Sequence, residues 1–188
     1  QRQMCIRDRH SILNRAFYGV PIFTNSEGLH TNAVFGFLNI MFKIIDSKQP
    51  DYMAVAFDVH QPTFRHEMFK DYKGTRKPMM EELREQVPVI KELLQKMNIT
   101  TVELPGYEAD DVIGTLSKKG EKAGMEVDVI SGDRDLLQLA SDHITICIPK
   151  TKKGQTTVEE YNTEGVRKLY KVTPTEFIDV KALMGDSS

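Results

Sequence analysis

The stretch that decides the fold runs from residue 101 to residue 139 and reads TVELPGYEADDVIGTLSKKGEKAGMEVDVISGDRDLLQL. Its apolar spacing predicts a strand over residues 101–104 and a helix over residues 108–123 that ends at Gly124. A short buried strand is predicted to follow over residues 127–130. A strand, a helix and a strand in this order are typical of an α/β fold with a parallel sheet.

The rest of the chain continues this alternation. An amphipathic helix over residues 31–48 precedes a strand, YMAVAF, over residues 52–57. A second helix is predicted over residues 81–97, where Pro88 kinks or divides it. Further elements are a strand at 144–148 after a short helix at 135–140, a hairpin tip at 150–157 and a final helix at 174–184. We therefore expect ligands to bind beyond the carboxyl ends of the strands of a mostly parallel sheet.

Length and composition set the class of protein. The chain has 188 residues of which 40% are hydrophobic, enough for the core of one domain. Its two cysteines lie far apart, which argues against a disulfide framework or a zinc site. Since no apolar run approaches the roughly 20 residues that span a bilayer, we expect a soluble, cytoplasmic protein. The net charge is only −2, but bases gather at 65–84 and acids at 103–135.

Acidic residues follow three of the predicted strands, and these are Asp58, Glu108, Asp110, Asp111, Asp133 and Asp135. Taken singly, each has an ordinary explanation as a turn residue or as a partner of a helix dipole. Together they would repel one another unless divalent cations supplied counter-charge, and ligands that are all oxygen favour Mg²⁺ or Mn²⁺. Two such ions are typical of phosphodiester hydrolysis. We expect Asp186 to join the cluster.

Residues 62–77, PTFRHEMFKDYKGTRK, interleave aromatic and basic side chains. This mixture is suited to base stacking and phosphate contacts, although a solvated helix face has the same composition. Because the segment begins just after Asp58, we expect it to overhang the acidic mouth.

At these residues the sequence resembles a known family. The motifs NRAFYG, HTNAVFGFLN, AVAFD, PTFRHEMFKDYKGTRKP, GYEADDVIGTL, SGDRDLLQL and KALMGDSS resemble the 5'-nuclease domain of bacterial DNA polymerase I, in the flap endonuclease family. The resemblance implies a PIN-like α/β fold and a 5'-3' exonuclease and 5'-flap endonuclease of DNA replication and repair. It implies two-metal catalysis with Mg²⁺ or Mn²⁺ on DNA that carries a 5' flap, a nick or an RNA primer.

The resemblance also implies a role for individual residues. The metal ligands would be Asp8, Asp58, Glu108, Asp110, Asp111, Asp133, Asp135 and Asp186. Lys73 and Arg76 would be catalytic residues that hold the scissile phosphate, Tyr72 would contact a base, and Arg15 and Arg65 would assist DNA binding. Residues 73–99 would form the helical arch through which the single-stranded 5' end passes.

The two ends of the chain depart from the family pattern. Residues 1–9, QRQMCIRDR, lack an apolar run, and Arg9 replaces the glycine that follows the first ligand, Asp8. We interpret residues 1–9 as a non-native leader and expect no central buried strand there. Residues 10–188 would be the N-terminal catalytic part, cut before a helix-three-turn-helix. The parent would be DNA polymerase I, with its polymerase domain, or a stand-alone exonuclease, and in either case a monomer.

Two alternatives remain at this point. A PIN-type ribonuclease shares the acidic α/β mouth but lacks the basic arch segment. A catalytically inactive DNA-binding fragment would result if the missing residues after Ser188 are essential.

Overall fold

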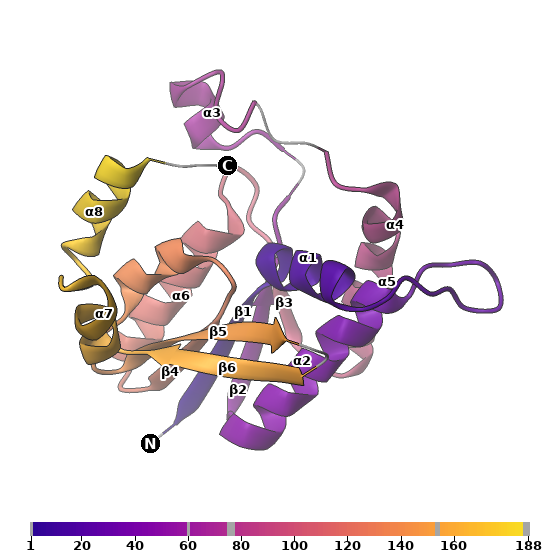
Figure 1. Ribbon diagram of the computed structural model, residues 1–188, viewed down its shortest axis with the longest axis horizontal. Helices are drawn as coiled ribbons and strands as arrows, with labels where there is room; N and C mark the ends of the chain where they lie inside the picture. Colours follow the sequence, from indigo (N-terminus) through magenta and orange to yellow (C-terminus); the bar gives the residue numbers. More distant parts are fainter. Residues whose placement is uncertain (1, 60, 75–77, 153–154, 186–188) are drawn as a thin grey trace.

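The computed structural model describes residues 2–59, 61–74, 78–152 and 155–185 (Figure 1). The side chains of residues 7–11, 151–152 and 155–156 are outside this description.

A six-stranded sheet forms the centre of the molecule. Its strands in chain order are β1 (Gln3–Asp8), β2 (Tyr52–Ala56), β3 (Thr100–Val102), β4 (Glu126–Ile130), β5 (Ile144–Lys152) and β6 (Gln155–Tyr161). Across the sheet they lie in the order β3-β2-β1-β4-β5-β6, with the first five parallel and β6 antiparallel to β5. The predicted mostly parallel α/β sheet and the hairpin at its end are confirmed.

Helices cover both faces of the sheet. One face carries α1 (Arg9–Gly19), α2 (Asn32–Lys48), α4 (Glu81–Arg84) and α5 (Gln86–Lys96). The other carries α6 (Ala109–Lys122), the 3-10 helix η1 (Arg134–Leu139), α7 (Thr163–Tyr170) and α8 (Phe177–Met184). The short helix α3 (Phe64–Met68) stands above the layers in Figure 1. None of the described helices is long and apolar enough to cross a membrane.

Alternation along the strands creates one hydrophobic core on each face. Neighbouring strand residues point to opposite faces, so Cys5 and Val55 join the core under α2 while Ile6 and Ala56 join the core under α6. All four side chains are fully buried. A sheet buried on both faces holds its strand ends rigidly, and these ends carry the acidic residues.

The expectation that residues 1–9 would not form a central strand is wrong. β1 pairs in parallel with β2 on one side and with β4 on the other. Its three apolar residues suffice because Cys5 fills one core, Ile6 fills the other, and Met4 packs against the second. Two neighbouring strands supply the backbone hydrogen bonds. The assignment of these residues as a leader stays a prediction.

The predicted helix over residues 81–97 is divided at Glu85, three residues before Pro88. A proline clashes with the carbonyl group four residues earlier and has no N–H to donate to it. That carbonyl belongs to Arg84, so the break falls one turn before the proline. Gly124 follows α6 with a φ of 75°, as the predicted helix end requires.

Candidate active site

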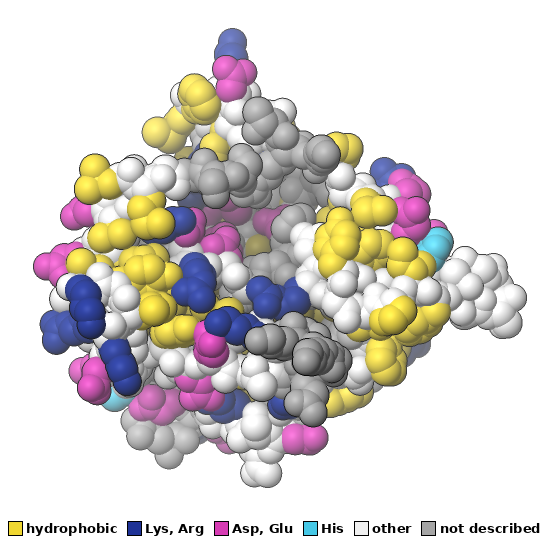
Figure 2. Space-filling view, in the orientation of Figure 1, with side chains coloured by type: hydrophobic (Ala, Val, Ile, Leu, Met, Phe, Trp, Pro, Cys, Tyr) yellow, Lys and Arg dark blue, Asp and Glu magenta, His cyan; other side chains and the backbone are white. Residues whose placement is uncertain are grey.

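The carboxyl ends of the parallel strands lie at one edge of the sheet, and acidic residues follow them there. Asp8 ends β1 beside Ala56 of β2, and Asp58 follows two residues after Ala56. Figure 2 shows Asp and Glu side chains gathered in a hollow between the α3 segment and the body of the molecule, with Lys and Arg side chains along its lower edge.

The first turn of α6 brings three of the predicted ligands together. Asp58 Oδ1 accepts a hydrogen bond from the Ala109 N–H at 2.9 Å, which fastens the end of β2 to the start of α6. Glu108 is the N-cap residue of α6, and its N–H donates to Asp111 Oδ2 at 3.0 Å. Negative charge is stabilised at a helix N-terminus by the helix dipole. Local structure alone thus accounts for part of this acidic group.

The basic segment lies directly over these acids. Arg65 of α3 donates two hydrogen bonds to Asp111, at 2.7 and 2.8 Å, and approaches Glu108 to 3.8 Å. Lys73 Nζ lies 2.7 Å from Glu108 Oε1, and the Tyr72 hydroxyl donates to Glu108 Oε2 at 3.2 Å. The expectation that this segment overhangs the acidic mouth is confirmed.

The charges of this cluster stabilise one another. The Arg65 hydrogen bonds lower the pKa of Asp111, and the same bonds raise the pKa of Arg65. Burial raises the pKa of Tyr72, because the phenolate would lose its hydration. At neutral pH the Asp111 carboxylate is therefore ionised. The Tyr72 hydroxyl keeps its proton and donates a hydrogen bond to Glu108.

A second acidic pair follows β4. Asp133 Oδ1 accepts from the Asp135 N–H at 2.8 Å and caps η1, while the Asp133 N–H donates to the Ser131 hydroxyl at 2.9 Å. Asp135 forms an ion pair with Lys181 of α8, at 2.9 Å. Sequence reasoning missed Lys181, because only the packing of α8 against η1 brings it to this position.

The other predicted residues are placed less fully. Asp110 is half-buried in the first turn of α6. Arg15 Nη1 donates to the Pro149 carbonyl oxygen at 2.5 Å, and its Nε is buried without a hydrogen-bond partner among the described residues. Arg15 thus contacts β5, and no described bond joins it to the acids above. Arg76, Asp186 and the side chain of Asp8 lie outside the described part of the chain.

The fit of the site to a metal ion depends on donor chemistry. Within the described side chains, no three His, Cys, Asp or Glu residues are grouped closely enough to hold a metal ion. Every candidate is nevertheless a carboxylate, the donor that Mg²⁺ and Mn²⁺ prefer. The cations Arg65, Lys73 and Lys181 now supply the positive charge at these acids. The donor set therefore fits a hard divalent cation that replaces them.

Comparisons with known proteins agree with this geometry. A family model described as the N-terminal, resolvase-like domain of 5'-3' exonucleases matches residues 3–171. The chain is 49% identical to the DNA polymerase I of Bacillus caldotenax and 50% identical to that of Bacillus subtilis (strain 168), over 188 residues in each case. Each of these matches covers 100% of this chain but only 21% of the relative. The chain thus spans about a fifth of the curated relatives it matches.

Solved structures show the same fold. The T5 5'-exonuclease with bound divalent metal ions (zinc) has a TM-score of 0.75 at 25% identity, over 98% of this chain and 67% of that one. A T5 flap endonuclease in a complex with DNA and metal ions has a TM-score of 0.74 at 24% identity, with the same coverage. The predicted PIN-like fold is confirmed by these similarities. The family match favours a 5'-3' exonuclease domain over the alternative of a PIN-type ribonuclease. The chain belongs to the family of 5'-3' exonuclease N-terminal, resolvase-like domains.

Proposed function

We propose that this chain is the catalytic part of a structure-specific 5'-3' exonuclease and 5'-flap endonuclease that hydrolyses DNA phosphodiesters. One observation carries the proposal: Arg65 and Lys73 lie within bonding distance of the carboxylates Asp111 and Glu108 at the start of α6. A nuclease needs both groups at one place, acids for divalent cations and bases for phosphates. The similarity to 5'-3' exonuclease domains supports the same activity.

The acids would hold Mg²⁺ or Mn²⁺, with two ions as the number expected from the size of the set. The proposed ligands are Asp8, Asp58, Glu108, Asp110, Asp111, Asp133, Asp135 and Asp186. Two divalent cations, when bound, would stabilise the attacking and leaving oxygens of a phosphodiester. The divalent ions bound to the T5 5'-exonuclease support metal use.

The basic side chains would hold the DNA. Lys73 and Arg76 would contact the scissile phosphate, Tyr72 a base, and Arg65 and Arg15 the neighbouring backbone. A guanidinium forms the same two-bond contact with a phosphate as with a carboxylate. Arg65 and Lys73 can therefore pass from Asp111 and Glu108 to the DNA, which leaves these acids available to metal ions.

The substrate would be DNA with a 5' flap, a nick or an RNA primer, and the intact protein a DNA polymerase I. A helical arch over residues 73–99 would admit the single strand. Its far end would be anchored by α5, because Ile90 and Leu94 are buried in the core under α2.

The proposal is tested by cleavage of a 5'-flap duplex with Mg²⁺ and with a chelator. We expect cutting near the flap junction only with Mg²⁺. The Asp58→Asn variant keeps a side-chain oxygen that can accept from the Ala109 N–H but loses the charge, so we expect cleavage about 100-fold slower. Asp142→Asn, at an exposed acid before β5, is the matched control and should cut normally. Cleavage without divalent metal, or equal rates for the two variants, would contradict the proposal.

A further inference from the structure

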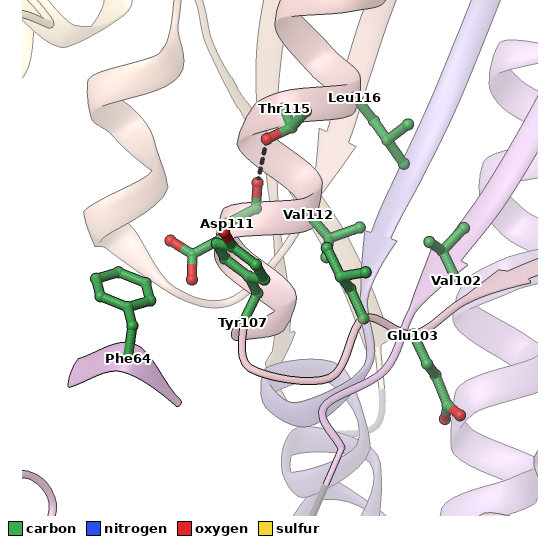
Figure 3. Close-up of a pocket in the computed structure, with 9 residues that line it drawn as sticks. Phe64, Val102, Glu103, Tyr107, Asp111, Val112, Thr115 and Leu116 are labelled. Atoms are coloured by element: carbon green, nitrogen blue, oxygen red, sulfur yellow. Dashed lines mark hydrogen bonds between the residues drawn. The ribbon is translucent and has the colours of Figure 1, made fainter. Parts of the chain in front are cut away.

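A pocket of about 560 Å³ lies between α3, the start of α6 and the edge strand β3 (Figure 3). Ligand pockets typically measure about 300–1,000 Å³. The residues that line it are Phe64, Val102, Glu103, Leu104, Tyr107, Asp111, Val112, Thr115 and Leu116. Of these residues, the proposed cleavage chemistry uses only Asp111.

The pocket has apolar walls and two exposed aromatic rings. Phe64 of α3 and Tyr107 before α6 have ring centroids 5.8 Å apart, and they are 38% and 48% exposed. Val102 and Leu116 approach from β3 and α6, and in Figure 3 the carboxylate of Glu103 points away from them. Exposed aromatic rings beside an apolar hollow favour a flat, uncharged ligand.

The charges around the pocket are already paired. Glu103 forms an ion pair with Lys91, and Asp111 forms one with Arg65. The interior of the pocket is therefore close to neutral, while Arg65 and Lys91 flank it. A neutral aromatic group attached to an anionic chain fits this arrangement, and a nucleotide has this composition.

The pocket is continuous with the candidate active site. Arg65 Cζ lies 4.5 Å from the centroid of the Phe64 ring, and the same guanidinium holds Asp111. Asp111 lines the pocket and also belongs to the acidic cluster. A phosphate bound by Arg65 would thus have its own base, or the adjacent one, beside Phe64 and Tyr107.

We propose that this pocket binds a nucleobase of single-stranded DNA, one whose phosphate lies at Arg65. The proposal rests on the proposed function for the identity of the ligand as DNA. It adds a base-binding site that holds the strand in register with the acidic cluster.

The test uses fluorescent 5'-flap oligonucleotides that each carry one abasic site, moved stepwise along the flap. Binding is measured with a chelator present, so that no strand is cut. For the unmodified chain we expect one position at which loss of the base weakens binding by roughly 5- to 150-fold, the range for stacking on an aromatic side chain. The other flap positions should have little effect.

Three variants connect this effect to the pocket. Tyr107→Ala should weaken binding of the intact flap and abolish the sensitivity to the abasic site, whereas Tyr107→Phe should retain both. Tyr52→Ala is the control, because Tyr52 is an equally exposed tyrosine at the start of β2 and does not line the pocket. It should keep the full abasic penalty.

A second measurement uses only the unmodified chain, so it does not depend on how a variant folds. In methyl NMR spectra, the Val102 and Leu116 signals should shift on addition of the intact flap and not with the sensitive position abasic. Insensitivity at every flap position, or a penalty that persists in Tyr107→Ala, would overturn the proposal. Methyl shifts that depend on protein concentration alone would overturn it in favour of a second copy. Flap cleavage without any abasic effect would refute the pocket alone, whereas an abasic effect without cleavage would refute the nuclease activity alone.

Discussion

Lys73 shows how single residues are held in this site. Its backbone has a φ of 56°, in the left-handed region that costs a residue with a side chain about 1 kcal/mol. The ion pair with Glu108 offsets this cost and points the ammonium group at the acids. Lys73 thus forms an ion pair with Glu108, a carboxylate that a metal ion would need under the proposed function.

The Lys73→Met variant should therefore bind Mn²⁺ more tightly than the unmodified chain when no DNA is present. Removal of a competing cation is worth about 1 kcal/mol, which corresponds to an increase of roughly fivefold in affinity. The same variant should bind flap DNA more weakly, because it loses the proposed contact of Lys73 with the scissile phosphate. Mn²⁺ titration followed by electron paramagnetic resonance measures the first effect. Lys70→Met, at an exposed position of the same segment, is the control, and equal Mn²⁺ affinities in the two variants would refute the competition.

His143 gives a prediction about pH. A hydrogen bond with Glu126 raises its pKa above the ordinary value of 6.5. A raised pKa in the folded state contributes stability that is present below pH 6.5 and is lost as the pH rises through the raised pKa. His143→Gln should lower the urea midpoint at about pH 5.5 and leave it unchanged at about pH 9. An equal loss at both pH values would show that packing, not charge, is responsible.

At the scale of residues, the sequence predicts the acids better than their partners. Asp58 and Asp133 are predictable because acids that follow parallel strands meet at one edge of the sheet. The pairing of Arg65 with Asp111 is not predictable, because it depends on where α3 sits. That position involves a backbone hydrogen bond from Phe64 to Gly106, which no periodicity reveals.

Among the elements, a joint at Gln86 connects α5 to α2. Gln86 Oε1 accepts from the N–H groups of Ala33 and Val34, at 2.8 and 3.1 Å. Its Nε2 donates to Asn32 Oδ1 at 3.1 Å and to the Glu82 carbonyl oxygen at 2.7 Å. A residue of one helix thereby caps the N-terminus of another, where Thr31 supplies no side-chain cap.

Gln86→Ala should destabilise the fold by about 2–3 kcal/mol, because it leaves two buried N–H groups of α2 without acceptors. Urea unfolding measures this loss. Gln95→Ala, at an exposed position of the same helix, should change stability by less than about 0.5 kcal/mol. Similar losses in both variants would mean that a general effect of the substitution in α5, and not the contacts of Gln86 with α2, explains the result.

The predictability of elements follows their length and periodicity. The helix α2 and the strands β2 and β4 match their predictions within one or two residues, because their apolar patterns are continuous. The strand β1 was missed because it has only three consecutive apolar residues and depends on its neighbours. The predicted helix after Asp133 forms as a 3-10 helix instead, and it is short enough for the tighter hydrogen bonding.

For the whole molecule, the arrangement of charge matters more than its sum. A net charge of −2 gives no indication of a nucleic-acid partner. The fold concentrates acids at one edge of a sheet that is buried on both faces and places Arg65 and Lys73 over them. The parallel sheet is predictable from alternating elements, whereas the pocket beside β3 is not, because it requires α3 in its observed position.

The acidic cluster is proposed to bind divalent metal ions, and this can be measured without DNA. Mn²⁺ titration of the unmodified chain and of Asp58→Asn, followed by electron paramagnetic resonance, measures this binding. We expect the unmodified chain to bind Mn²⁺, and Asp58→Asn, which keeps an oxygen for the Ala109 N–H, to bind it at least about tenfold more weakly. Identical Mn²⁺ binding by the two proteins would show that these carboxylates do not form a metal site.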